Sequence, residues 1–203
     1  MSIATQLAPA LLEVMPSSIR RFTVEEYLHI IRAGVFADGE RLELLEGYIV
    51  PKMPRNPPHD ATIELVQDAL QGRLPAGFRV RVQCGALGLD SVPEPDLAVV
   101  RGDIRARGAR HPGPPDIALV VEVSDSSLAQ DRGIKRRLYA RAGFAAYWIV
   151  NLVDSRVEAH SDPTGPAPDP TFRLREEFGS DAAVPLVIDG VEVARIAVRE
   201  LLL

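Results

Sequence analysis

The sequence of 203 residues lacks a second cysteine beside Cys84, which excludes an intrachain disulfide and a zinc site built from several cysteines. This cysteine usage fits a reducing compartment, and we expect a cytoplasmic protein. Cys84 lies in RVRVQCGALGL, where apolar and polar residues alternate as in a strand. We therefore expect a small buried hydrophobe at this position rather than a catalytic thiol.

Long apolar segments are also missing. The uninterrupted apolar stretches fall short of the ~20 residues that a membrane-spanning helix needs, so we expect no membrane partner. The apolar N-terminus differs from a signal peptide because its basic residues, Arg20 and Arg21, follow the apolar run instead of preceding it. Without internal repeats or a clear linker, we predict an N-terminal arm or short helix over residues 1–20 and a single domain over residues 21–203.

An excess of positive charge is absent as well, since the net charge is -5 and the pI is near 5.4. These values exclude a protein that coats nucleic acid through a broad basic face, but they leave room for a nuclease with a local basic patch. Two stretches could supply such a patch or could be ordinary solvated faces: Arg101, Arg105, Arg107 and Arg110, and then Arg132, Lys135, Arg136, Arg137 and Arg141.

The apolar patterns that are present predict alternating helices and strands. Thr23 and Glu26 have the spacing of a capping box for a helix through Ile31, and Gly47 marks a turn inside the strand-like run RLELLEGYIV. Helices are predicted over residues 61–74 and 128–142, and strands at FRVRVQ, DLAVV, DIALVVEV, AAYWIVNL, RVEAHS, FRLREEF, VPLVI and VEV. This order predicts an α/β (α+β) domain with a mixed central β-sheet flanked by helices.

Two acids stand where these strands should be apolar. Glu122 closes the run IALVV, and an unpaired carboxylate there would cost several kcal/mol in desolvation, so it must meet a metal, a Lys or Arg, or a proton. Asp96 begins the strand DLAVV, 26 residues earlier. Two carboxylates that converge from neighbouring strands form an oxygen site suited to Mg²⁺ or Mn²⁺.

Further candidates surround these two acids. Lys135 either forms an ordinary i,i+4 pair with Asp131 or points its ammonium across the sheet at the acids. Glu43 is a third candidate acid, and the sequence leaves open whether Glu46 takes its place. His59 is the only histidine near these elements, and the other histidines have no companions at metal-ligand spacing.

The order of LELLEGYIV, PPHD, PEPDLAVV, VVEVSDSS, D-x-x-x-K-x-x-x-YA and AGFAAYWIV resembles the Uma-type family of putative restriction endonucleases, within the PD-(D/E)XK nuclease superfamily. The resemblance covers about residues 22–157. It implies a restriction-endonuclease-like core with Asp96 and Glu122 as metal ligands and Glu43 as a further site acid. In one departure, the superfamily's usual lysine position, two residues after the second acid, holds Ser124; Lys135 on the following helix matches the displaced lysine.

The resemblance implies a metal-dependent DNA endonuclease. Asp96, Glu122 and the Val123 carbonyl would hold Mg²⁺ or Mn²⁺, and Lys135 would orient the attacking water. We assign His59, Arg132 and Tyr139 to substrate binding and expect a homodimer, since cutting both strands of a duplex needs two sites. The alternatives are a nuclease fold that serves as a binding or scaffolding module with little or no activity, and a hydrolase for a small phosphodiester.

Overall fold

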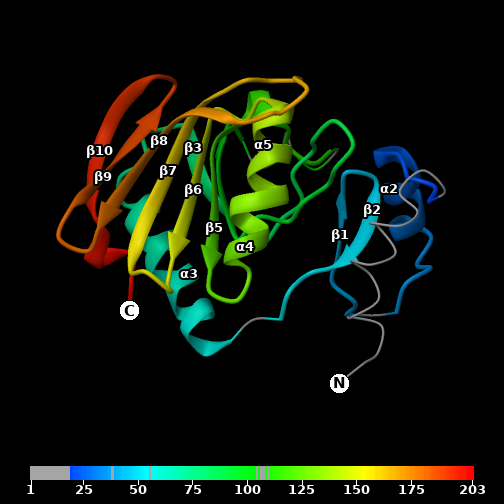
Figure 1. Ribbon diagram of the computed structural model, residues 1–203, viewed down its shortest axis with the longest axis horizontal. Helices are drawn as coiled ribbons and strands as arrows, with labels where there is room; N and C mark the ends of the chain where they lie inside the picture. Colours follow the sequence, from blue (N-terminus) through cyan, green and yellow to red (C-terminus); the bar gives the residue numbers. More distant parts are fainter. Residues whose placement is uncertain (1–18, 38, 55, 104, 106–107, 109) are drawn as a thin grey trace.

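The computed structural model describes residues 19–37, 39–54, 56–103, 105, 108 and 110–203 (Figure 1). Most of the N-terminal arm predicted over residues 1–20 therefore lies outside the described residues, as does Arg107 of the first arginine-rich stretch. Within the described ranges, no helix combines the length and the apolar character that crossing a membrane requires.

A six-stranded mixed sheet forms the centre of the molecule, in the order β3-β4-β5-β6-β7-β8. Its strands are β3 (Phe78–Val82), β4 (Leu97–Arg101), β5 (Ile117–Ser124), β6 (Ala146–Asn151), β7 (Arg156–Pro163) and β8 (Phe172–Gly179). Only the β5–β6 pair of this sheet is parallel, because a helical crossover joins these two strands. The predicted mixed sheet between helices is confirmed, and β5 is buried at every position, as expected for a central strand.

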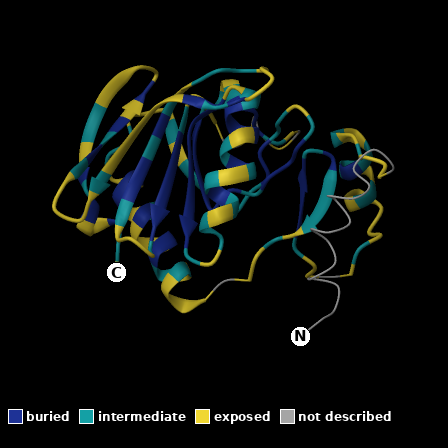
Figure 2. Cartoon of the chain, viewed as in Figure 1, coloured by how far each residue is buried: buried dark blue, intermediate teal, exposed yellow. Residues whose placement is uncertain are grey.

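The two faces of the sheet are covered by different elements (Figures 1 and 2). Helix α3 (Pro57–Gln71), the hairpin of β9 (Ala183–Ile188) and β10 (Val191–Ala197), and the short helix η4 (Val198–Glu200) pack on one face. The predicted helix at residues 61–74 begins four residues earlier, because the Asn56 side chain caps it by accepting a hydrogen bond from the His59 amide at 3.0 Å.

The other face is covered by the crossover helix. The continuous helix predicted over residues 128–142 is divided into α4 (Leu128–Gln130), a π-helical turn η3 (Asp131–Lys135) and α5 (Arg136–Ala142). Gly143 ends it as predicted, in the left-handed region at φ 84°. A π-turn inserts an extra residue into a helix and changes which side chains face inward. Here the side chains at both ends of the turn, Asp131 and Lys135, are buried toward the sheet.

A smaller N-terminal layer lies beside the sheet (Figure 1). Helix α2 (Val24–Arg32) has the predicted capping box, in which Thr23 and Glu26 exchange hydrogen bonds. Strands β1 (Leu42–Leu45) and β2 (Tyr48–Pro51) form a hairpin whose two-residue turn needs positive φ at both positions, 49° at Glu46 and 82° at Gly47. This hairpin holds Glu43, on β1, beside the main sheet.

Candidate active site

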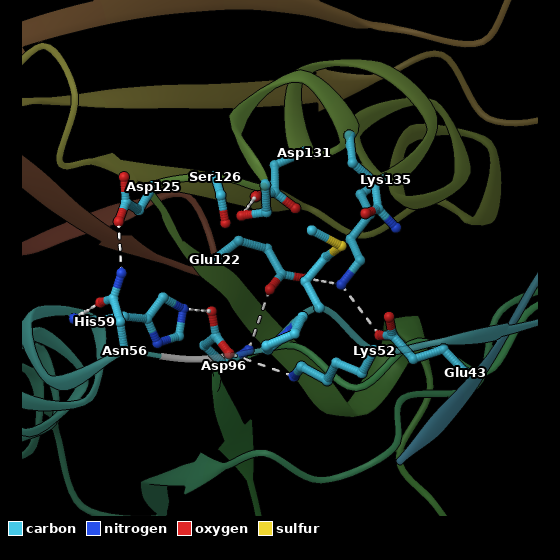
Figure 3. Close-up of a pocket in the computed structure, with 14 residues that line it drawn as sticks. Glu43, Lys52, Asn56, His59, Asp96, Glu122, Asp125, Ser126, Asp131 and Lys135 are labelled. Carbon is cyan, nitrogen blue, oxygen red and sulfur yellow. Dashed lines mark hydrogen bonds and ion pairs between the residues drawn. The ribbon is translucent and has the colours of Figure 1, made fainter. Parts of the chain in front are cut away.

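A polar pocket lies where the N-terminal hairpin, helix α3, strand β5 and the crossover helix meet (Figure 3). It encloses about 480 Å³, its open mouth included. The lining residues are Glu43, Lys52, Met53, Pro54, Asn56, His59, Asp96, Glu122, Asp125, Ser126, Ser127, Gln130, Asp131 and Lys135. The structure therefore brings together five of the residues singled out in the sequence: Glu43, His59, Asp96, Glu122 and Lys135.

Strand register places the two central acids opposite each other. Leu97 pairs with Val121 in the antiparallel β4–β5 ladder, so the next pair along brings Asp96 opposite Glu122. Each carboxylate accepts a backbone hydrogen bond from the other strand: the Asp96 amide donates to Glu122 Oε2 at 3.3 Å, and the Val123 amide donates to Asp96 Oδ2 at 3.0 Å. Both side chains are buried, so these amides compensate part of their lost hydration.

Lys135 reaches across from the crossover helix to the acids. Its Nζ lies 2.9 Å from Glu122 Oε1 and 3.1 Å from Glu43 Oε1. Burial opposes the charged ammonium, but the carboxylates of Glu122 and Glu43 outweigh this effect and raise the pKa of Lys135. Lys135 therefore stays protonated and acts as a hydrogen-bond donor, not as a base.

The i,i+4 partner weighed for Lys135, Asp131, has its own donors. The hydroxyls of Ser124 and Ser127 donate to its Oδ2 at 2.7 and 2.6 Å. Ser124, at the position where the resemblance would place the usual lysine, instead binds a buried carboxylate. Burial raises the pKa of Asp131.

Asp96 is flanked by two further cationic side chains. His59 Nε2 lies 3.2 Å from Oδ2, and Lys52 Nζ lies 3.3 Å from Oδ1. Burial works against the ionised carboxylate, yet His59 and Lys52 lower the pKa of Asp96 far below its usual range. In turn Asp96 raises the pKa of His59, although burial disfavours the imidazolium.

Lys52, Asn56, Asp125 and Asp131 are pocket residues that sequence reasoning missed or explained otherwise. A usable signal existed for Lys52, because the chain has only two lysines among its 23 basic residues, and both line this pocket. Asn56 donates from Nδ2 to Asp125 Oδ2 at 2.8 Å and so joins the start of α3 to the loop after β5. Nothing in the local sequence distinguishes this pair from ordinary loop residues.

The acids outnumber the lysines in the pocket. Five carboxylates line the pocket, against the ammonium groups of Lys52 and Lys135, which leaves a formal charge of -3 when all are ionised and His59 is neutral: Glu43, Asp96, Glu122, Asp125 and Asp131. Burial raises the pKa of Glu122, and Lys135 only partly reverses this shift. A divalent cation would balance most of this charge.

The donor set suits a hard cation. Among the described residues, no donor forms a hydrogen bond with the buried Oδ1 of Asp96. Within the same residues, no three His, Cys, Asp or Glu side chains are grouped to hold a metal, so the protein offers two facing carboxylates rather than a full cage. This arrangement fits Mg²⁺, which is usually held by one or two carboxylates and keeps several of its waters.

Three other residues lie differently from the roles considered for them. Arg132 turns away from the pocket, because the buried Glu158 binds its Nε at 2.9 Å. Tyr139 is fully buried and donates its hydroxyl to Glu122 Oε1 at 2.8 Å, so its contact is with a site acid. Glu46 binds Arg137 at 2.6 Å, which leaves Glu43 as the glutamate of β1 and its turn that lines the pocket.

Several arginines of the two arginine-rich stretches form ion pairs with acids of the chain. Ion pairs join Arg101 to Asp189, Arg110 to Asp116, Arg137 to Glu46, and Arg141 to Asp90. Each of these arginines is thus at least partly neutralised by an acid of the chain.

Comparison with known proteins supports a nuclease fold. A crystal structure of a putative nuclease belonging to DUF820, from Anabaena variabilis ATCC 29413, superposes with a TM-score of 0.66 at 16% identity, over 89% of this chain and 97% of that one. A comparison with curated proteins found no match. The family described as Uma2, putative restriction endonuclease, matches residues 24–196, which include every element that lines the pocket. The chain therefore belongs to the Uma2 family of putative restriction endonucleases.

Proposed function

We propose that the chain is a metal-dependent endonuclease that hydrolyses DNA phosphodiester bonds in this pocket. The observation that carries the proposal is the pair of facing carboxylates, Asp96 and Glu122, with the Lys135 ammonium bound to one of them. Membership of a family of putative restriction endonucleases supports the reaction class.

Asp96 and Glu122 would hold Mg²⁺ or Mn²⁺, and the Val123 carbonyl is the proposed third protein ligand. The bound ion would polarise the scissile phosphate and lower the pKa of a water. Hydrolysis adds the oxygen of that water to phosphorus and breaks one P–O ester bond, which yields a phosphomonoester and an alcohol. The geometry of Asp96 and Glu122 is fixed before substrate arrives, because each carboxylate is already bonded to a backbone amide of the other strand.

The remaining residues of the pocket orient this pair. Lys135 stays protonated, so its role is to orient the attacking water and to stabilise the negative charge that develops on the phosphate. Glu43 positions that ammonium from the opposite side at 3.1 Å. Tyr139 fixes Glu122, and we assign His59, at the inner wall of the pocket, to contact with the substrate.

The direct test is nicking of supercoiled plasmid in Mg²⁺ and then Mn²⁺. Wild type is compared with Asp96→Ala and Lys135→Ala, and circular dichroism checks that each variant is folded. Metal-dependent nicking that both substitutions abolish is the expected result. Equal nicking by wild type and both variants would contradict the proposal, since the activity would then come from elsewhere.

One observation favours the second candidate, a nuclease fold that binds or scaffolds with little activity. Four of the arginines that could have supplied a DNA-binding patch form ion pairs with acids of the same chain, which weakens electrostatic attraction to a polyanion: Arg101, Arg110, Arg137 and Arg141. The two candidates differ in metal binding, since a scaffold needs no metal at Asp96 and Glu122. Calorimetry with Mg²⁺ on wild type and Glu122→Ala separates them.

We also propose a homodimer, because two such sites are needed to cut both strands of a duplex. Sedimentation equilibrium over a wide range of protein concentrations tests this directly. The expected mass is twice 22.1 kDa, and a monomer mass at every concentration would contradict it.

A further inference from the structure

Lys52 lies in a position that the proposed mechanism does not use. Its side chain is only 7% exposed, and its Nζ lies 3.3 Å from Asp96 Oδ1 (Figure 3). The same ammonium donates to the backbone carbonyl of Glu94. Burying a lysine is costly unless its charge is matched, so this location indicates a specific contact with Asp96 rather than incidental packing.

The atom that Lys52 faces is the one that a metal would use. Asp96 Oδ2 already accepts from the Val123 amide and faces His59, whereas Oδ1 has no hydrogen-bond donor in the described part of the chain. Oδ1 is therefore the oxygen available for coordination, and the Lys52 ammonium is the positive charge nearest to it. Two positive charges cannot share one carboxylate oxygen at such distances without strong repulsion.

A lysine can give up a contact with a carboxylate more easily than an arginine can. A lysine side chain carries a compact charge on a flexible four-carbon stem, whereas a guanidinium forms a rigid planar fork. The chain uses arginine at 21 of its 23 basic positions, and its two lysines are both in this pocket. Lys135 is fixed between two carboxylates, but Lys52 contacts one carboxylate and one carbonyl.

We propose that Lys52 and a divalent metal compete for Asp96 Oδ1, so that Lys52 compensates the charge of the buried carboxylate while it weakens metal binding. This inference rests on the proposed metal site at Asp96 and Glu122. Metal binding then requires the ammonium to swing away from Oδ1, with the Glu94 carbonyl as the second contact that it already makes.

The test is calorimetric titration of Mn²⁺ into wild type, Lys52→Met and Lys52→Arg. Lys52→Met keeps an unbranched side chain of similar length without the charge, and we expect it to bind Mn²⁺ roughly tenfold to a hundredfold more tightly than wild type. Lys52→Arg keeps the charge and serves as the matched control, and we expect it to bind Mn²⁺ no more tightly than wild type, because a positive charge stays beside Oδ1. Asp96→Asn in the Lys52→Met background should remove the tight binding and so assign it to Asp96.

Thermal unfolding is a second measurement, and it remains informative if a variant is less stable than wild type. Thermal unfolding with and without Mn²⁺ should show a larger stabilisation by the metal in Lys52→Met than in wild type, because tighter binding to the native state raises its stability further. Equal or weaker Mn²⁺ affinity in Lys52→Met would overturn the competition while the metal site itself stands. Absence of Mn²⁺ binding in all variants, Lys52→Met included, would instead overturn both the metal site and the inference that rests on it.

Discussion

Two buried glutamates lie in one row of the sheet and have opposite electrostatic environments. Glu122 on β5 is registered with Ile149 on β6, and Ile149 is registered with Glu158 on β7. The two carboxylates therefore belong to the same face, two strands apart, a separation of about 10 Å. Burial alone would raise the pKa of both groups, yet only that of Glu122 is raised.

The partners of the two acids explain the difference. Glu158 accepts from Arg132, Arg175 and Asn151, and these partners lower its pKa in spite of burial. Glu122 shares the single ammonium of Lys135 with Glu43 and lies beside Asp96. A buried acid that binds two arginines of its own is a structural element, whereas an acid that shares one cation inside a pocket is suited to receive another.

The largest expected effect is on nicking activity, which should depend on Glu122 but not on Glu158. Glu122→Gln should reduce metal-dependent plasmid nicking on the order of 1000-fold, because loss of a metal ligand removes several kcal/mol of transition-state stabilisation. Glu158→Gln should keep the wild-type rate within a few-fold, since this side chain contacts no pocket residue that we assign to the reaction. Similar losses in both variants would show that the two buried acids are not functionally distinct.

The next effect is the pH dependence of stability that His160 causes, on strand β7 two residues after Glu158. Burial, with Arg136 and Arg175 nearby, lowers the pKa of His160 from 6.5 to about 4. Between pH 6.5 and pH 4 this histidine is therefore protonated in the unfolded chain but neutral in the native state. Because the unfolded chain binds the extra proton, the unfolding free energy falls by about 3 kcal/mol as the pH drops through this range. Urea unfolding at several pH values should show this contribution in wild type and its loss in His160→Phe, which keeps the ring contact with Tyr147. Parallel stability profiles for the two proteins would refute the assignment.

A smaller effect measures how much the donors of Glu158 contribute. Glu158→Gln should lower the unfolding free energy by about 1–3 kcal/mol, because it weakens charge-assisted hydrogen bonds to a buried acceptor. Glu176→Gln, at an exposed position of β8, is the matched control and should change stability by less than about 0.5 kcal/mol. Denaturant midpoints at constant m-value report both differences, and equal midpoints for the two variants would argue against a stabilising role of Glu158.

The smallest expected effect is the change in nicking rate on removal of the hydrogen bond by which Tyr139 orients the Glu122 carboxylate. Tyr139→Phe removes the 2.8 Å hydrogen bond to Glu122 Oε1, and we expect a loss of up to about tenfold in nicking rate. Tyr147→Phe is the control, since its equally buried hydroxyl donates to the Asp131 carbonyl at 3.2 Å. The rate of this control should stay near that of wild type. An unchanged rate in Tyr139→Phe would show that backbone amides and Lys135 alone position the carboxylate.

Sequence patterns predicted most of the fold, because burial imposes short periods on the chain. The apolar runs in DLAVV and DIALVVEV identified β4 and β5, and Gly143 marked the end of the crossover helix. The π-turn at residues 131–135 was not predicted, since the apolar pattern was interpreted with the period of a regular α-helix, which allows for no inserted residue.

The sequence by itself determined that buried acids must exist, because Glu122 interrupts an otherwise apolar strand and its charge needs compensation. Only the tertiary structure decided which groups compensate them. Asp96 meets Glu122 through strand register, and Lys52 meets Asp96 across 44 residues of chain; Arg132, close to Lys135 in sequence, is bound by Glu158 instead. Charge compensation depends on distances of a few ångströms in space, and such distances are set by packing between elements rather than by proximity along the chain.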